Sequence, residues 1–77
     1  MSMLQIKSYY CVDKKSIVLK LAQARVSKNI SQYELSLRIG KSQCYIHEVE
    51  KGKSNLTLEA FLLICQELGI NPKDLFC

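Results

Sequence analysis

Residues 31–52 read SQYELSLRIGKSQCYIHEVEKG, and the caps and glycines in this stretch decide the fold. Ser31 followed three residues later by Glu34 forms a capping box, which is a typical start of a helix. Ile39 lies on the apolar side of that helix. Gly40 follows directly, and glycine is the residue that most easily takes the positive φ at a helix end. The pattern predicts a helix of about two turns.

A second short helix follows the glycine. Ser42 is its expected cap, Ile46 and Val49 are its buried positions at i and i+3, and Gly52 ends it. Two short helices joined by a glycine-containing turn form a helix-turn-helix, here at about residues 31–51. The outward face of the second helix is predicted to carry Gln43, Cys44, His47 and Glu48.

Further helices are expected on both sides of this motif. Asp13 is a plausible cap for a helix that Asn29 ends, and Thr57 caps a helix that Gly69 ends. Asn71 and Pro72 open a short fifth helix. The helix after Thr57 has a predicted core stripe, and two further apolar residues, Leu63 and Ile64, widen it; the stripe is Leu58, Phe61, Leu62, Cys65 and Leu68.

The sequence thus predicts an all-α, compact five-helix bundle without a sheet. Residues 13–77 form the domain, and residues 1–12 are expected to be an N-terminal arm. A chain of 77 residues has room for one core only. No apolar run approaches the ~18 residues of a membrane span, and the start lacks the apolar segment of a secretory signal. We therefore expect a cytoplasmic protein without a membrane partner.

Composition also bears on the chemistry. The formal net charge of +4 favours a polyanionic partner such as nucleic acid. The four cysteines include no CxxC pair, and the chain has a single histidine, so we expect unpaired thiols and no metal site. One histidine without an acid pair, and no phosphate-binding loop, argue against an enzyme. No cofactor or small-molecule ligand is evident.

Residues 31–76 resemble the Cro and phage-repressor type of helix-turn-helix, the XRE family, and the likeness extends back to about residue 13. It rests on Gln32 at the start of the first helix of the motif, Gly40, Ile46, the EKGK sequence at 50–53, and the closing NPKDLF. Ser36 replaces the alanine usual in the family. The chain's size and its SNLTLEAF segment also resemble restriction–modification controller proteins.

The resemblance implies a DNA-binding transcriptional regulator, a repressor or controller, that acts as a homodimer on an inverted-repeat operator in the bacterial or phage cytoplasm. It implies base contacts by Gln43, Cys44, His47 and Glu48. Gln43 is suited to adenine and Glu48 to cytosine N4, whereas Cys44 can offer an apolar contact to a thymine methyl. His47 could equally face solvent without a specific contact.

Phosphate contacts, which position the protein and supply much of the affinity, are expected from a second group of residues. They are Gln32, Lys41, Ser42, Tyr45, Lys51, Lys53 and Asn55. Lysines of the first helix are expected to form a solvated face instead. They are Lys14, Lys15, Lys20 and Lys28.

The family pairs an arginine of the first helix with a glutamate at the end of the second helix of the motif, which here implies an ion pair between Arg25 and Glu50. Apolar residues near the carboxyl end are expected to form the dimer interface. They are Leu63, Ile64, Leu75 and Phe76. Two alternatives stay open: an antitoxin of a toxin–antitoxin pair, and a helical protein-interaction module without DNA binding. Salt-dependent binding to duplex DNA separates the second from a regulator.

Overall fold

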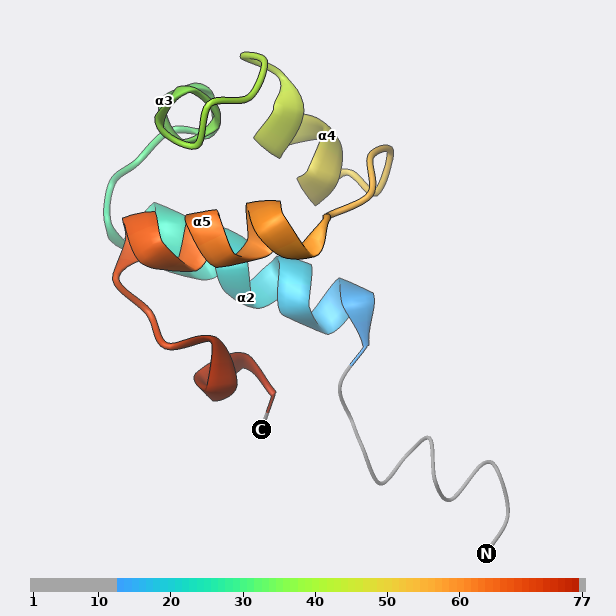
Figure 1. Ribbon diagram of the computed structural model, residues 1–77, viewed down its shortest axis with the longest axis vertical. Coiled ribbons are helices and arrows are strands. Elements are labelled where there is room, and N and C mark those ends of the chain that lie inside the picture. The colour runs from blue at the N-terminus through green and yellow to red at the C-terminus, as the bar shows by residue number, and fades with distance from the viewer. Residues whose placement is uncertain (1–12, 77) are drawn as a thin grey trace, which may run out of the picture.

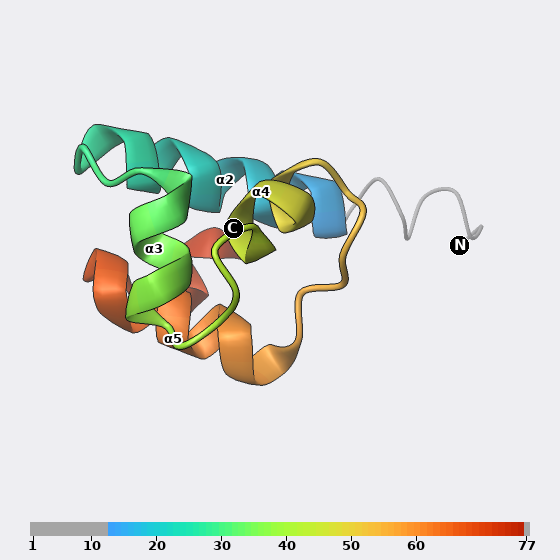
Figure 2. The ribbon, with the colours of Figure 1, turned by 90° about the horizontal axis from the view of Figure 1, so that it is seen from above.

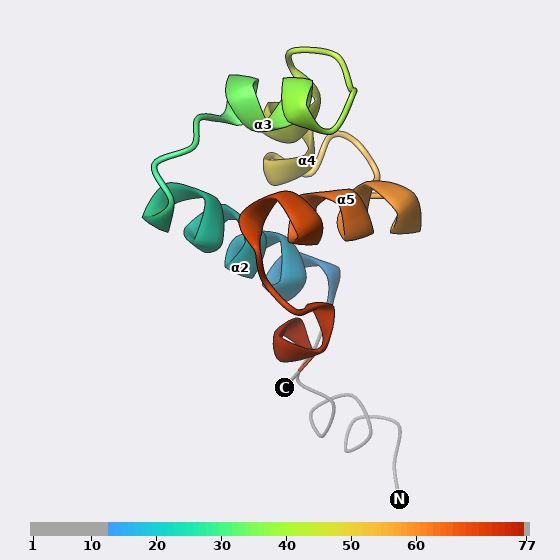
Figure 3. The ribbon, with the colours of Figure 1, turned by 60° about the vertical axis from the view of Figure 1, so that its left-hand side comes forward.

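The computed structural model describes residues 13–76, so the predicted arm at 1–12 and Cys77 lie outside the described residues. The elements are α2 (Lys14–Ser27), α3 (Gln32–Arg38), α4 (Tyr45–Glu50), α5 (Leu58–Leu68) and η1 (Pro72–Leu75), and no strand occurs among these residues. The all-α prediction is confirmed. Figure 1 shows α3 and α4 on one side of the α2–α5 pair and η1 on the other, and Figure 3 shows the same order from a second direction.

The prediction of five α-helices is wrong, because the last element is a 3₁₀ turn of four residues. Asn71 caps it as expected, since its side-chain oxygen accepts a hydrogen bond from the amide of Lys73 at 3.1 Å. The amide of Phe76 then donates to the carbonyl of Lys73, which is the three-residue spacing of a 3₁₀ helix. The chain thus has four α-helices and one short turn in its described part.

The predicted N-caps of the longer helices are present. Asp13, Ser31 and Thr57 each accept a hydrogen bond from the amide three residues on, at 2.8, 2.9 and 3.1 Å. The capping box is only half formed, because the Glu34 carboxylate pairs with Arg38 at 2.7 Å instead of returning to the amide of Ser31. The local signals for the starts of α2, α3 and α5 were therefore sound, apart from that return bond.

The core lies between the α2–α5 layer and the α3–α4 pair. Figure 2, seen from above, shows α3 crossing over α2 and α5, with α4 beside it. Every element contributes to one apolar cluster. Its buried members are Leu21, Ile30, Leu35, Ile39, Ile46, Phe61, Ile64, Cys65, Leu68 and Leu75. The small domain therefore has a single continuous core.

The predicted buried stripe of α5 is wrong in part. Leu58 and Leu62 are 71% and 48% exposed, while Ala60 and Ile64 lie inside. Because α5 is apolar on more than one face, periodicity alone cannot choose the face that packs; contact with α2 and α3 makes that choice.

Two residues predicted for the dimer interface belong to the core instead. Ile64 and Leu75 are 2% and 6% exposed. Ile64 lies on the buried face of α5, and η1 turns Leu75 inward while the Phe76 ring packs edge-on against Phe61, with centroids 6.1 Å apart. Leu63 is half-buried against the core, so Phe76 is the exposed member of the predicted set.

Candidate nucleic-acid interface

The turn between α3 and α4 is built from local backbone bonds. Gly40 has a φ of 75°, and the amide of Lys41 donates to the carbonyl of Ser36 at 3.0 Å. This is the arrangement that ends a helix with a left-handed glycine and satisfies one of its last carbonyls. Gly52, with a φ of 81°, follows α4. This turn joins α3 and α4 into a helix-turn-helix.

The start of α4 differs from the prediction. Ser42 is not the cap, because α4 begins at Tyr45 and is preceded by Cys44, which makes no side-chain cap bond. The bond is supplied from α3: the hydroxyl of Ser36 accepts from the amide of Ile46 at 3.0 Å. Ser36 is fully buried, and it also donates to a carbonyl one turn back in its own helix at 2.8 Å. The hydroxyl that departs from the family's alanine thus joins the two helices.

The predicted base-reading residues lie partly in the turn before α4 and partly on α4 itself. Gln43 and Cys44 are exposed in the turn before α4, not on its face as expected, whereas His47 is exposed on α4 itself. Glu48 is half-buried, and its carboxylate accepts a hydrogen bond from the Ser54 hydroxyl at 3.4 Å. Three of the four residues are therefore open to a ligand, and the fourth is partly engaged within the chain.

The expected ion pair between Arg25 and Glu50 is present. The guanidinium donates from Nε to one carboxylate oxygen at 2.9 Å and from Nη2 to the other at 3.2 Å. The side chains are only 12% and 16% exposed. A third bond, from Nη1 to the carbonyl of Ile30 at 2.8 Å, ties α2 to the loop before α3. The pair thus fixes the end of α4 against α2.

Gln32, expected at a phosphate, has both polar atoms of its side chain engaged inside the chain. Its Nε2 donates to Glu50 at 2.7 Å, and its Oε1 lies 3.1 Å from Nδ1 of His47. Gln32 is half-buried. Its side chain therefore braces α4 through both of these bonds.

Several expected phosphate-binding residues lie in a row. The ammonium of Lys41 stands over the ring of Tyr45, 5.6 Å from its centroid, and the Tyr45 hydroxyl donates to the carbonyl of Asn55 at 3.4 Å. The side-chain oxygen of Asn55 in turn accepts from Lys14 at 2.9 Å. Lys14 was assigned to a solvated face, and the sequence carries no signal for this contact because 41 residues separate the two partners.

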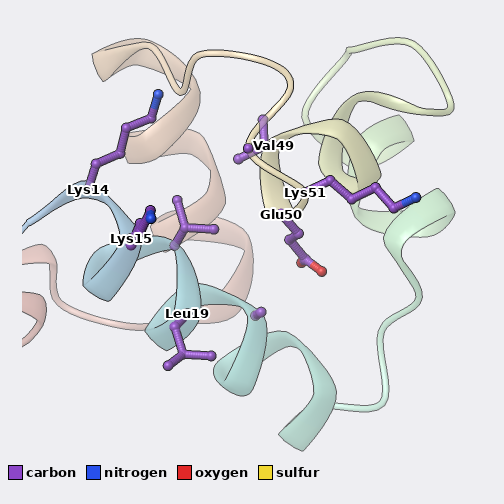
Figure 4. A pocket seen from close by; sticks show the side chains of 9 residues that line it. Lys14, Lys15, Leu19, Val49, Glu50 and Lys51 are labelled. Atoms are coloured by element: carbon purple, nitrogen blue, oxygen red, sulfur yellow. The ribbon is translucent and has the colours of Figure 1, made fainter.

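Lys15 and Lys51, together with Lys14, flank a hollow of about 460 Å³ between the start of α2 and the end of α4. Figure 4 shows Lys14 and Lys15 on the α2 side and Lys51 on the α4 side, with Leu19 and Val49 on its walls. Lys51 and Lys53 are exposed, and so is Ser42 in the turn. Lysines of α2 and of the end of α4 therefore lie around one hollow, together with Glu50.

Metal binding and thiol chemistry depend on how the histidine, cysteine and acidic side chains are placed. Within residues 13–76, no cluster of three or more histidine, cysteine or acidic side chains could bind a metal ion. Cys44 and Cys65 are free thiols, and burial raises the pKa of the Cys65 thiol, which makes it less reactive. None of the described helices is both long enough and apolar enough to traverse a bilayer.

The motif, its turn and its buried brace define a helix-turn-helix protein. The family model described as "Helix-turn-helix" matches residues 21–75, and the chain belongs to that family. It is a DNA-binding regulator of the XRE type rather than a member of an enzyme family.

Two similar proteins indicate a narrower group within this family. The chain is 39% identical over 57 residues to the control protein C.BamHI of Bacillus amyloliquefaciens, covering 73% of this chain and 70% of that one. Its fold matches the crystal structure of the restriction–modification controller protein C.AhdI from Aeromonas hydrophila. The TM-score is 0.73 at 31% identity, over 83% of this chain and 97% of the other. The resemblance to controller proteins is thereby confirmed.

Proposed function

We propose that this chain is a controller-type transcriptional regulator that binds a specific sequence of double-stranded DNA as a homodimer on an inverted-repeat operator. The observation that carries the proposal is the rigid presentation of α4. Ser36 holds its first turn and Arg25 holds its last residue, while Gln43 and His47 are exposed. A recognition helix needs this combination, because base readout requires fixed side chains with free polar ends.

The proposed division of labour follows from chemistry. Gln43 can bind N6 and N7 of adenine through its amide, and Cys44 can contact a thymine methyl. The lysines beside the motif neutralise phosphates without reading sequence. We add Lys14 to them, because its ammonium meets Asn55 in the row that ends at Lys41. Glu48 contributes to readout only if DNA displaces Ser54 from its carboxylate.

The homodimer is supported by what one copy leaves uncovered. A single helix reads too few base pairs to specify an operator, and two copies can place their helices in successive major grooves ~34 Å apart. Leu58, Leu62 and Phe76 are all at least 48% exposed. Leu58 and Phe76 also border an apolar groove of about 470 Å³ with Ile17 and Leu56. We propose that these residues replace Ile64 and Leu75 as the dimer surface.

The test of DNA binding begins with selection of the bound sequence from a random duplex library. The Gln43→Ala variant should then lose about 1–3 kcal/mol at the selected site and relax its preference at one base pair. The Lys53→Ala variant should weaken binding to all duplexes alike and reduce the salt slope by about 1. Fluorescence anisotropy over a salt series measures both effects.

The two measurements test two different claims, base readout by Gln43 and DNA binding by the whole protein. Equal affinity of wild type and Gln43→Ala for the selected site would refute base readout by that residue. If the wild-type protein shows no salt-dependent binding to any duplex, the alternative of a helical protein-interaction module replaces the regulator.

A further inference from the structure

A chain of hydrogen bonds runs from the interior to the exposed face of α4. It begins at Arg25, whose guanidinium donates twice to Glu50 at 2.9 and 3.2 Å. The same carboxylate accepts from Nε2 of Gln32 at 2.7 Å. The Oε1 of Gln32 lies 3.1 Å from Nδ1 of His47, which is exposed. Three helices thus contribute to the setting of one imidazole ring.

The direction of each bond is fixed by what its atoms can do. The Glu50 carboxylate beside an arginine only accepts, so Gln32 must turn its amide nitrogen toward it. The carbonyl oxygen of Gln32 then faces His47, and a carbonyl also only accepts. Nδ1 of His47 must therefore carry a proton. In a neutral ring Nε2 is then an acceptor, the reverse of the tautomer that free histidine prefers.

Resting on the proposed function, we propose that His47 determines specificity by accepting a hydrogen bond at Nε2 from an exocyclic amino group in the major groove. Such donors are N6 of adenine and N4 of cytosine, whereas guanine and thymine present acceptors there. Gln32 is the positioning residue, since it sets the tautomer of His47 without itself touching a base. A ring with its proton on Nε2 would instead donate to the acceptors of guanine or thymine.

The tautomer can be measured without DNA. The chain has one histidine, so a long-range ¹H–¹⁵N correlation spectrum of the full chain at pH 8 shows a single ring. We expect a protonated Nδ1 and an unprotonated Nε2 for His47. In Gln32→Met, which keeps the length of the side chain but removes its amide, the ring should change to the tautomer with its proton on Nε2.

Circular dichroism tests whether Gln32→Met is folded. If the variant is unfolded, the wild-type ¹H–¹⁵N spectrum alone decides which tautomer His47 adopts. A wild-type ring that carries its proton on Nε2 overturns the assignment of Gln32. This result is independent of whether the protein binds any duplex.

The readout is tested on the selected DNA site. Each adenine in turn is replaced by purine and each cytosine by 2-pyrimidinone, which removes only the exocyclic amine. At one position of each half-site, removal of the amine should lower the affinity of wild type about fivefold. The Gln43→Ala variant should remain sensitive to removal of the amine at that same position. His47→Phe should bind that substituted site and the natural one equally, and Gln32→Met should discriminate less than wild type.

The base at the sensitive position identifies adenine or cytosine as the partner. If His47→Phe keeps the same sensitivities as wild type at every position, the proposed readout is overturned. If the wild-type protein binds no duplex, the proposed function fails, while the spectrum still reports the tautomer.

Discussion

At the scale of single residues, two arginine–carboxylate pairs in this chain differ in burial and in the number of hydrogen bonds that each arginine donates. Arg25 and Glu50 are 12% and 16% exposed, whereas Arg38 and Glu34 are 42% and 48% exposed. Water and salt screen the second pair, so its contribution to stability is small. The first pair holds α4 in place, and loss of one partner leaves a charge in a poorly hydrated site.

We therefore expect Arg25→Ala to lower the free energy of unfolding by ~3–5 kcal/mol. The control Arg38→Ala removes an arginine from an exposed ion pair and should cost less than ~1 kcal/mol. Urea denaturation followed by circular dichroism measures both. Equal midpoints for the two variants would contradict a structural role for the buried pair.

At the scale of elements, the sequence predicted helix starts and ends better than helix faces. Asp13, Ser31 and Thr57 were found as caps because capping depends on residues three apart. Asn29, with a φ of 58°, was found just after the end of α2 because asparagine tolerates the left-handed conformation. The exposed face of α5 was not predictable, because an apolar helix shows no preference until its neighbours are placed.

The features of the candidate DNA-binding site likewise fall into those that the sequence predicted and those that it did not. The pair of Arg25 and Glu50 followed from the family resemblance, and the exposure of His47 followed from helical spacing. The cap of α4 did not, because Ser36 lies ten residues before the amide that it binds. Lys14 was likewise missed, since its contact with Asn55 depends on the packing of α2 beside the loop. Long-range polar contacts have no periodic signature in a sequence.

The cap of α4 makes a prediction at this scale. Ser36→Ala should lower the free energy of unfolding by ~1–3 kcal/mol, because it leaves the buried amide of Ile46 without an acceptor. Ser42→Ala is the control, since Ser42 is exposed and meets Tyr45 only through its backbone carbonyl. It should leave the stability within about 0.5 kcal/mol of wild type.

Thermal unfolding of the two variants compares them directly. Amide hydrogen exchange adds a local measurement, because Ile46 should lose protection in Ser36→Ala ahead of the rest of α4. Unchanged protection there would show that the hydroxyl is not the effective cap.

At the scale of the whole molecule, the described chain carries more apolar surface than its own core can cover. Leu58, Leu62 and Phe76 are exposed on α5 and after η1, and Leu58 and Phe76 line a groove together with Ile17 and Leu56. Exposed apolar side chains beside an apolar groove on a small domain mark an interaction surface. A second copy of the chain meets the same surface with itself under two-fold symmetry, as a homodimer requires.

Leu62→Glu tests this surface, because a two-fold contact would bring two buried like charges together. The matched control is Leu37→Glu, since Leu37 is 50% exposed on α3 and Leu62 is 48% exposed. In sedimentation at micromolar concentration, wild type and Leu37→Glu should run at about twice the 8.8 kDa chain mass, and Leu62→Glu as a monomer. A monomeric wild type would refute dimerisation, and a dimeric Leu62→Glu would refute this surface. Because Leu62 lies outside the helix-turn-helix, the monomeric variant should still bind an isolated half-site but gain little from a second one.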